Sequence, residues 1–95
     1  KRSIADGRID WRMAAESIHN LVRGLTLPYV GAHFDCGNRL IKVWKTAVVI
    51  DVPENLEPGK ILSVDGDGIV VKAGIDAIQL LDYSPRVYLQ IGQYL

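Results

Sequence analysis

The sequence predicts a small antiparallel β-barrel with one helix at its N-terminal end. Three observations support this fold class. A segment near the N-terminus has apolar residues at helical spacing, the remainder divides into short β-rich segments, and turn residues separate those segments at short intervals. Short strands joined by tight turns are typical of a closed or partly closed barrel. We expect the helix to cover the barrel as a lid.

The predicted helix covers residues 13–25, with the sequence MAAESIHNLVRGL. Asp10 can cap the free amide groups at its start, and Gly24 lies where such helices tend to end. Apolar side chains form one stripe along it, as expected for a helix that packs on a core. The members of the stripe are Ala14, Ile18, Leu21, Val22 and Leu25.

The segments after the helix predict five strands. Within the longest one, Ile41 and Val43 alternate with Lys42 and Trp44, and the pattern slips near Lys45 and Thr46, as it does at a β-bulge or a sharp bend. Cys36-Gly37-Asn38 predicts a tight turn before that strand. Apolar residues at positions 87, 91, 94 and 95 can share a helical face, so we expect a short closing helix within 86–95. The predicted strands are 32–35, 39–50, 60–64, 69–73 and 77–83.

Length and composition predict one domain, with residues 1–8 as the tail of a linker and residues 9–95 as the barrel. No run of about 18 apolar residues exists, so a membrane-spanning helix is not expected. The chain begins Lys-Arg-Ser-Ile, without an initiator Met or a signal peptide, which suggests a piece of a longer protein. The single Cys36 fits a reducing cytoplasm.

Charge is unevenly distributed although the net charge is zero. Residues 1–45 hold eight basic and four acidic side chains, and residues 46–95 hold three basic and seven acidic ones. The basic half could present a patch to phosphate groups. An ordinary mixed surface is the favoured alternative, because dedicated nucleic-acid modules are usually basic overall. The candidates for contact with an acceptor or its phosphates are Arg12, Arg23, Arg39, Lys42 and Lys45.

Catalytic and metal-binding patterns are missing from the sequence. His19, His33, Asp35 and Cys36 lack the spacing of a zinc site, and the Asp65–Gly68 turn lacks the later ligands of a calcium loop. No carboxylate pair is placed for acid–base chemistry. We therefore predict no catalytic residue and no metal ligand.

The two tryptophans have competing interpretations. Trp11 and Trp44 could stack on nucleic-acid bases, but packing in the core is favoured because most large aromatic side chains of small domains are buried.

An ordered series of short motifs covers nearly the whole chain: DGRIDW (6–11), IHNLVRGL (18–25), PYVGA (28–32), RLIKVWK (39–45), PGKIL (58–62) and GIVV (68–71). The series resembles the C-terminal domain of formyltransferases that use 10-formyltetrahydrofolate, a group that includes methionyl-tRNA and nucleotide-sugar formyltransferases. The resemblance implies a Greek-key open barrel similar to an OB-fold. It also implies that the catalytic Asn, His and Asp lie in a separate N-terminal domain outside these residues.

The resemblance implies a non-catalytic domain that helps acceptor binding or assembly. The parent enzyme would transfer a formyl group from 10-formyltetrahydrofolate to an amine, and this chain would bind no cofactor itself. Its partner would be the N-terminal catalytic domain. Leu27 before Pro28 and Val30 before Gly31 depart from the family pattern, and together with the neutral charge they favour a nucleotide-sugar or small-amine acceptor over tRNA. The alternatives are a stand-alone OB-like module that binds tRNA and a purely structural or dimerisation domain.

Overall fold

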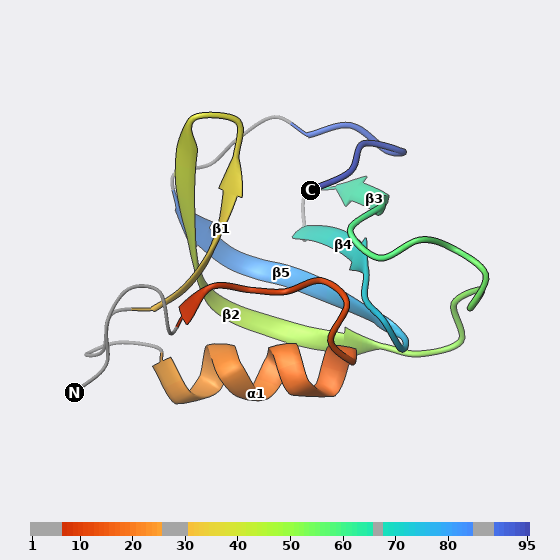
Figure 1. Cartoon of the computed structure of the whole chain (residues 1–95), viewed down its shortest axis with the longest axis horizontal. Coiled ribbons are helices and arrows are strands. Elements are labelled where there is room, and N and C mark those ends of the chain that lie inside the picture. The colour runs from red at the N-terminus through yellow and green to blue at the C-terminus, as the bar shows by residue number, and fades with distance from the viewer. Residues whose placement is uncertain (1–6, 26–30, 66–67, 85–88) are drawn as a thin grey trace.

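The computed structural model describes residues 7–25, 31–65, 68–84 and 89–95. Within these residues, one N-terminal helix is followed by five strands (Figure 1). This confirms a mainly β fold with an N-terminal helix. The elements are α1 (Ala15–Leu25), β1 (Ala32–Cys36), β2 (Arg39–Val49), β3 (Ile61–Asp65), β4 (Gly68–Lys72) and β5 (Ala77–Ser84).

The strands form one antiparallel sheet in the order β1-β2-β5-β4-β3. β5 returns to lie between β2 and β4, which is the kind of long-range connection expected in a Greek key. No pairing joins β1 to β3 among the described residues, so the sheet is open along one side, consistent with a small open barrel.

Two local features of the strands agree with the sequence. The β1–β2 hairpin turns at Gly37 and Asn38, and Gly37 has a φ of 63°, which glycine adopts without steric cost. In β2, the register to β5 shifts between Val43 and Lys45 and again between Lys45 and Thr46. The predicted bulge is therefore confirmed at that position.

Helix α1 begins at Ala15, two residues later than expected. Asp10 does not cap it, which corrects the prediction: its side chain accepts a hydrogen bond from the Arg12 amide instead, at 3.0 Å, in a turn before the helix. The first helical amide, that of Ala15, donates to the carbonyl oxygen of Ile75 at 2.9 Å. A tertiary contact thus replaces a local cap.

The buried face of α1 packs mainly on β2, and its buried residues are Ala15, Ile18, Val22 and Leu25. Beside this face, His19 Nδ1 and Thr46 Oγ1 share a hydrogen bond at 2.8 Å. His19 therefore closes the packing between the helix and the sheet, as expected.

Residues 7–14, which we call the strap, cross the open side of the sheet in front of β2 and β5 (Figure 1). At one end the amide of Ile9 donates to the carbonyl oxygen of His33 in β1, at 2.8 Å. At the other end the amide of Gly74 donates to the carbonyl oxygen of Met13, at 2.9 Å. The strap therefore links β1 to the turn between β4 and β5.

Trp11 fixes the middle of the strap to the core. Its side chain is 9% exposed, and its ring meets that of Phe34 edge-on with 5.4 Å between centroids. Core packing of Trp11 is therefore confirmed. Of the expected linker, residues 1–6 lie outside the described residues, and Gly7 and Arg8 belong to the strap.

The short closing helix is not formed where the structure describes it, over residues 89–95. Gly92 has a φ of 91°, which interrupts a helix, and Tyr94 forms an isolated antiparallel bridge with Lys60. The amide of Ile61 donates to the carbonyl oxygen of Gln93 at 2.8 Å. Within the segment, Gln90 and Gln93 bond to each other in a single turn, and the other backbone bonds run to residues 59–61 at the start of β3. The helical prediction was therefore wrong here.

Candidate functional site

The five basic candidates lie on different parts of the molecule. Arg12 is on the strap, Arg23 is in the last turn of α1, and Arg39 begins β2 beside the hairpin. Lys42 and Lys45 lie farther along β2, on either side of Trp44. The structure therefore does not gather them into one patch.

A different cluster forms where the strap meets β1. Arg8 of the strap pairs with His33 of β1, and His33 pairs with Lys42 of β2. Register partners on neighbouring strands point to the same face of a sheet. This face is opposite to the one on which Phe34 and Ile41 enter the core. We call Arg8, His33 and Lys42 the outer row.

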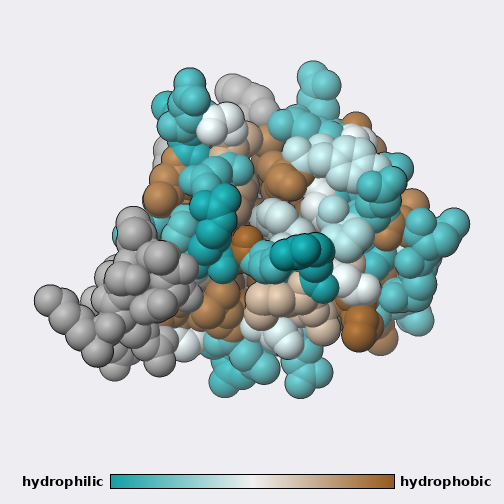
Figure 2. Space-filling model, viewed as in Figure 1, coloured by the Kyte–Doolittle hydropathy of each residue, from teal (hydrophilic) through white to brown (hydrophobic). Residues whose placement is uncertain are grey.

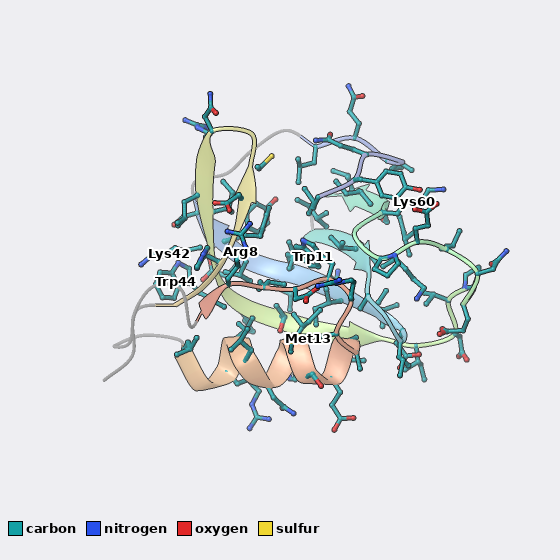
Figure 3. All side chains as sticks on the ribbon, in the orientation of Figure 1. Arg8, Trp11, Met13, Lys42, Trp44 and Lys60 are labelled. Atoms are coloured by element: carbon teal, nitrogen blue, oxygen red, sulfur yellow. The ribbon has the colours of Figure 1, made fainter. Side chains whose placement is uncertain are left out.

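Figure 3 shows Arg8, Lys42 and Trp44 at one end of the molecule, with Lys60 at the opposite end. The Arg8 guanidinium forms an ion pair with Asp35 of β1, with Nη1 to Oδ2 at 2.6 Å. The two side chains are 64% and 42% exposed. The ion pair orients Arg8 along β1 while leaving much of its guanidinium accessible to solvent.

His33 lies in the middle of the outer row and is only 4% exposed. Its Nδ1 atom is buried without a hydrogen-bond partner in the described part of the chain. Burial lowers the pKa of His33 below its ordinary value of 6.5; Asp35 opposes this shift, whereas Arg8 and Lys42 add to it. His33 is therefore mostly neutral at pH 7, and the row carries its charge at its two ends.

The strap also borders a shallow hollow of about 320 Å³, lined by residues 8–12. In this hollow, Arg12 donates to both carboxylate oxygens of Asp10, from Nε at 3.1 Å and from Nη2 at 3.0 Å. These hydrogen bonds lower the pKa of Asp10 and raise the pKa of Arg12. Both groups are charged at neutral pH. Figure 2 shows strongly hydrophilic side chains at the centre of the face that the strap crosses.

Trp44 lies beside the outer row on β2 and is half-buried. Its ring packs on Gly31, where an added Cβ would lie 2.7 Å from Cζ3 of the ring. Lys42 Nζ lies 5.9 Å from the ring centroid, within range of a cation–π interaction. The expected core packing thus holds only in part for Trp44.

The remaining reactive side chains are dispersed. Cys36 is half-buried and packs against the core. Within the ranges that the structure describes, no three His, Cys, Asp or Glu side chains are grouped so that they could hold a metal ion. No helix among those residues is long and apolar enough to cross a membrane.

Sequence reasoning missed Arg8 because it assigned residues 1–8 to a linker. A local signal was nevertheless present. Ile9 and Trp11 are buried, whereas Arg8 and Arg12 are exposed, so residues 8–12 alternate as a strand does. The position of this short segment beside His33 could not be read from the sequence, because the pairing spans 25 residues.

Comparisons with known proteins identify what the chain is similar to. The family model described as formyl transferase, C-terminal domain, matches residues 2–87. Methionyl-tRNA formyltransferase of Ruminiclostridium cellulolyticum is 38% identical over 93 residues, covering 94% of this chain and 29% of the relative. The same enzyme of Alkaliphilus metalliredigens is 37% identical over 92 residues, covering 94% and 28%. That of Clostridium beijerinckii is 38% identical over 89 residues, covering 92% and 28%.

Among solved structures, a variant of HypX from Aquifex aeolicus matches with a TM-score of 0.66 and 12% sequence identity. The match covers 84% of this chain and 14% of that one. At this identity the likeness shows a shared fold. The chain spans less than a third of the length of each curated relative given above.

Proposed function

The chain belongs to the formyl transferase C-terminal domain family, and from this membership we propose that it works as the non-catalytic domain of a larger formyltransferase. The parent enzyme would transfer a formyl group from 10-formyltetrahydrofolate to an acceptor amine in the cytoplasm. The chemistry would be performed by an N-terminal catalytic domain of the same protein. This domain would help to hold the acceptor, and 10-formyltetrahydrofolate would bind elsewhere.

We propose tRNA as the acceptor. The observation that carries this choice is that the three relatives above are all named methionyl-tRNA formyltransferases and match at least 92% of this chain. The neutral net charge and the departures around Pro28 favoured a smaller amine. The relatives outweigh that argument, because an uneven charge distribution lets a neutral domain present a locally basic face.

The role proposed for the domain is electrostatic contact with the RNA backbone. The outer surface of the strap supports this role, since the side chains of Arg8 and Arg12 are exposed on it. Lys42 lies near the Arg8 end of the strap, across His33 of β1. Arg23, Arg39 and Lys45 lie on other parts of the surface, and any contact they make would be separate from this one.

A purely structural role is the competing function, and two exposed side chains favour it. Ile50 follows the end of β2 and is 64% exposed, and Ile75 in the turn between β4 and β5 is 58% exposed. Exposed apolar side chains of this size can mark a contact with another domain. Such a contact would let the chain support assembly without touching the acceptor.

Titration of the chain with total tRNA at several salt concentrations separates these roles. We expect saturable binding that weakens steeply as salt rises, because phosphate contacts release condensed counterions. Absence of binding at low salt would contradict an acceptor contact. The structural role, with a small-amine acceptor for the parent enzyme, would then be favoured.

A further inference from the structure

We propose that the loop between β2 and β3 is a lid, which closes over the buried ammonium group of Lys72 and opens to expose it. The lid consists of residues 51–58. The carboxylate of Glu54 is the group that holds it closed. This conformational device goes beyond the proposed function and does not depend on which acceptor the parent enzyme uses.

Lys72 places a positive charge inside the molecule. It is the last residue of β4 and is 1% exposed. Its Nζ atom donates to the carbonyl oxygen of Ala73 at 2.6 Å. An ammonium group can donate three hydrogen bonds, so this bond leaves donors to spare. Because burial of a charged group is unfavourable without a compensating partner, Lys72 requires either an acidic side chain or access to water.

Glu54 supplies the compensating charge from the lid. Its Oε1 atom lies 4.0 Å from Lys72 Nζ, at the outer limit of an ion pair. The Glu54 side chain is 58% exposed, in contrast to that of Lys72. Exposed ion pairs contribute little to stability, because solvent screens them. The ion pair therefore holds the lid closed only weakly, and on opening, water would replace the carboxylate beside the ammonium group.

The backbone of the lid is arranged for movement about its two ends. Figure 1 shows the lid projecting from the sheet beyond the end of β2. Asp51 at its start has a φ of 63°, and Gly59 directly after it has a φ of 91°. The Gly59 amide donates to the carbonyl oxygen of Lys72 at 2.7 Å, which fixes the second end. Within the described ranges, no backbone–backbone hydrogen bond joins residues 51–56 to a strand. Hinge motions are absorbed by a few residues at such loop ends, so the lid can open while the sheet stays intact.

Acetylation of lysine amines measures how often the lid opens. The purified chain is treated with an acetylating reagent, and the rates at Lys72 and Lys45 are read separately by peptide mass spectrometry. Lys45 is exposed on β2 and serves as the internal reference. In the wild type we expect Lys72 to react about tenfold more slowly than Lys45 or slower still, because only the open form presents its amine.

Glu54→Ala should open the lid more often. We expect the rate at Lys72, relative to that at Lys45, to rise about twofold to fivefold, as when one partly exposed ion pair is lost. Glu57→Ala is the matched control, because it removes the same charge from another exposed position of the same lid. Its ratio of rates should equal that of the wild type.

Salt tests the ion pair without any substitution. Between 0.1 M and 1 M salt the Debye length falls from about 10 Å to about 3 Å, so the attraction between Glu54 and Lys72 is screened. The ratio of rates should rise with salt in the wild type and in Glu57→Ala, and should stay nearly constant in Glu54→Ala. Val52 and Leu56 are half-buried in the lid, and their packing is left unchanged in both variants.

Circular dichroism and thermal melting would verify that the variants fold, and Glu54→Gln, which keeps the size of the side chain, takes the place of Glu54→Ala if that variant does not. Three results would overturn the proposal: acetylation of Lys72 as fast as that of Lys45 in the wild type, a ratio in the Glu54 variant no higher than in Glu57→Ala, or a salt response that persists without the Glu54 carboxylate. None of these results bears on tRNA binding, so the proposed function would stand or fall separately.

Discussion

His33 combines burial with a polar atom that has no partner in the described structure. Its folded-state pKa lies below 6.5, mainly because burial disfavours the charged imidazolium. In the unfolded chain the imidazole is solvated and titrates near the ordinary value of about 6.5. Between the two pKa values the unfolded state binds more protons than the folded state, so acid favours unfolding in that range.

This difference predicts how stability depends on pH. The contribution of His33 should be fully present above about pH 6.5 and lost progressively as the pH falls through the lower, folded-state pKa. Urea unfolding of the wild type and of His33→Gln at pH 7.5 and at pH 5 would measure it. We expect the wild type to lose more free energy of unfolding between the two pH values than His33→Gln does. Equal losses in the two proteins would show that His33 is not responsible.

Gly74 permits the close approach of the strap to the turn between β4 and β5. A Cβ at this position would lie 1.9 Å from the carbonyl oxygen of Arg12. Gly74→Ala should therefore displace the strap and destabilise the fold by about 1–3 kcal/mol, as overpacking does. Chemical denaturation would give the value.

Gly24→Ala provides the control for this substitution. Gly24 lies in α1 and an added Cβ would meet nothing within 4 Å. Alanine there should stabilise the helix by about 0.5–1 kcal/mol. If both substitutions had the same effect, the proposed contact between the strap and Gly74 would be wrong.

At the scale of elements, the strap is the segment that sequence analysis described least well. The alternation of buried and exposed side chains in residues 8–12 is too short to stand out beside a linker. Its strand-like geometry comes from two distant partners, His33 and Gly74. The local sequence pattern therefore predicts that Trp11 fixes this segment to the core. It does not predict that the segment pairs with His33 and Gly74.

Trp11 should account for much of the strap's contribution to stability. Removal of a buried Trp side chain costs about 3–5 kcal/mol, because transfer energy is lost and a cavity remains. We expect Trp11→Ala to fall in this range in urea denaturation, since the ring packs against Phe34. Ile91→Ala, at a side chain that is 68% exposed, should change stability by less than about 0.5 kcal/mol. A small effect of Trp11→Ala would mean that the strap is not integral to the fold.

The strands and the C-terminal segment show where periodicity succeeds and where it fails. The slip at Lys45 and Thr46 correctly predicted a bulge, because a single inserted residue reverses the faces along one strand. Residues 86–95 have apolar spacing that suits a helix, yet Gly92 and the pairing of Tyr94 with Lys60 give residues 89–95 another structure. Four apolar positions are too few to outweigh backbone pairing with a neighbouring strand.

At the scale of the whole molecule, the fold class was predictable and the surface was not. Strand lengths and turns follow from local sequence. The outer row depends on pairings between the strap, β1 and β2 that join Arg8 to Lys42 across 34 residues. The sequence therefore supplied a set of basic residues, and the topology determined which of them lie together.

The chain alone should be catalytically inactive. Under the proposed function, formyl transfer is carried out by a separate catalytic domain, and this chain spans less than a third of the length of its curated relatives. Incubation with 10-formyltetrahydrofolate and acceptor tRNA should yield no formylated product. Product formation by the purified chain, above that of a heat-denatured sample, would refute the proposal that this domain is non-catalytic and that a separate domain performs the chemistry.

The central claim is that the face formed by the strap, β1 and β2 contacts acceptor tRNA. The most direct measurement is titration of the isotopically labelled chain with tRNA, observed through backbone amide signals in NMR spectra. We expect the signals of Arg8, His33 and Lys42 and their neighbours to shift or broaden first, while those of Lys60 and residues 89–95 change least. Perturbations centred on Lys60, or none on the outer row, would contradict it.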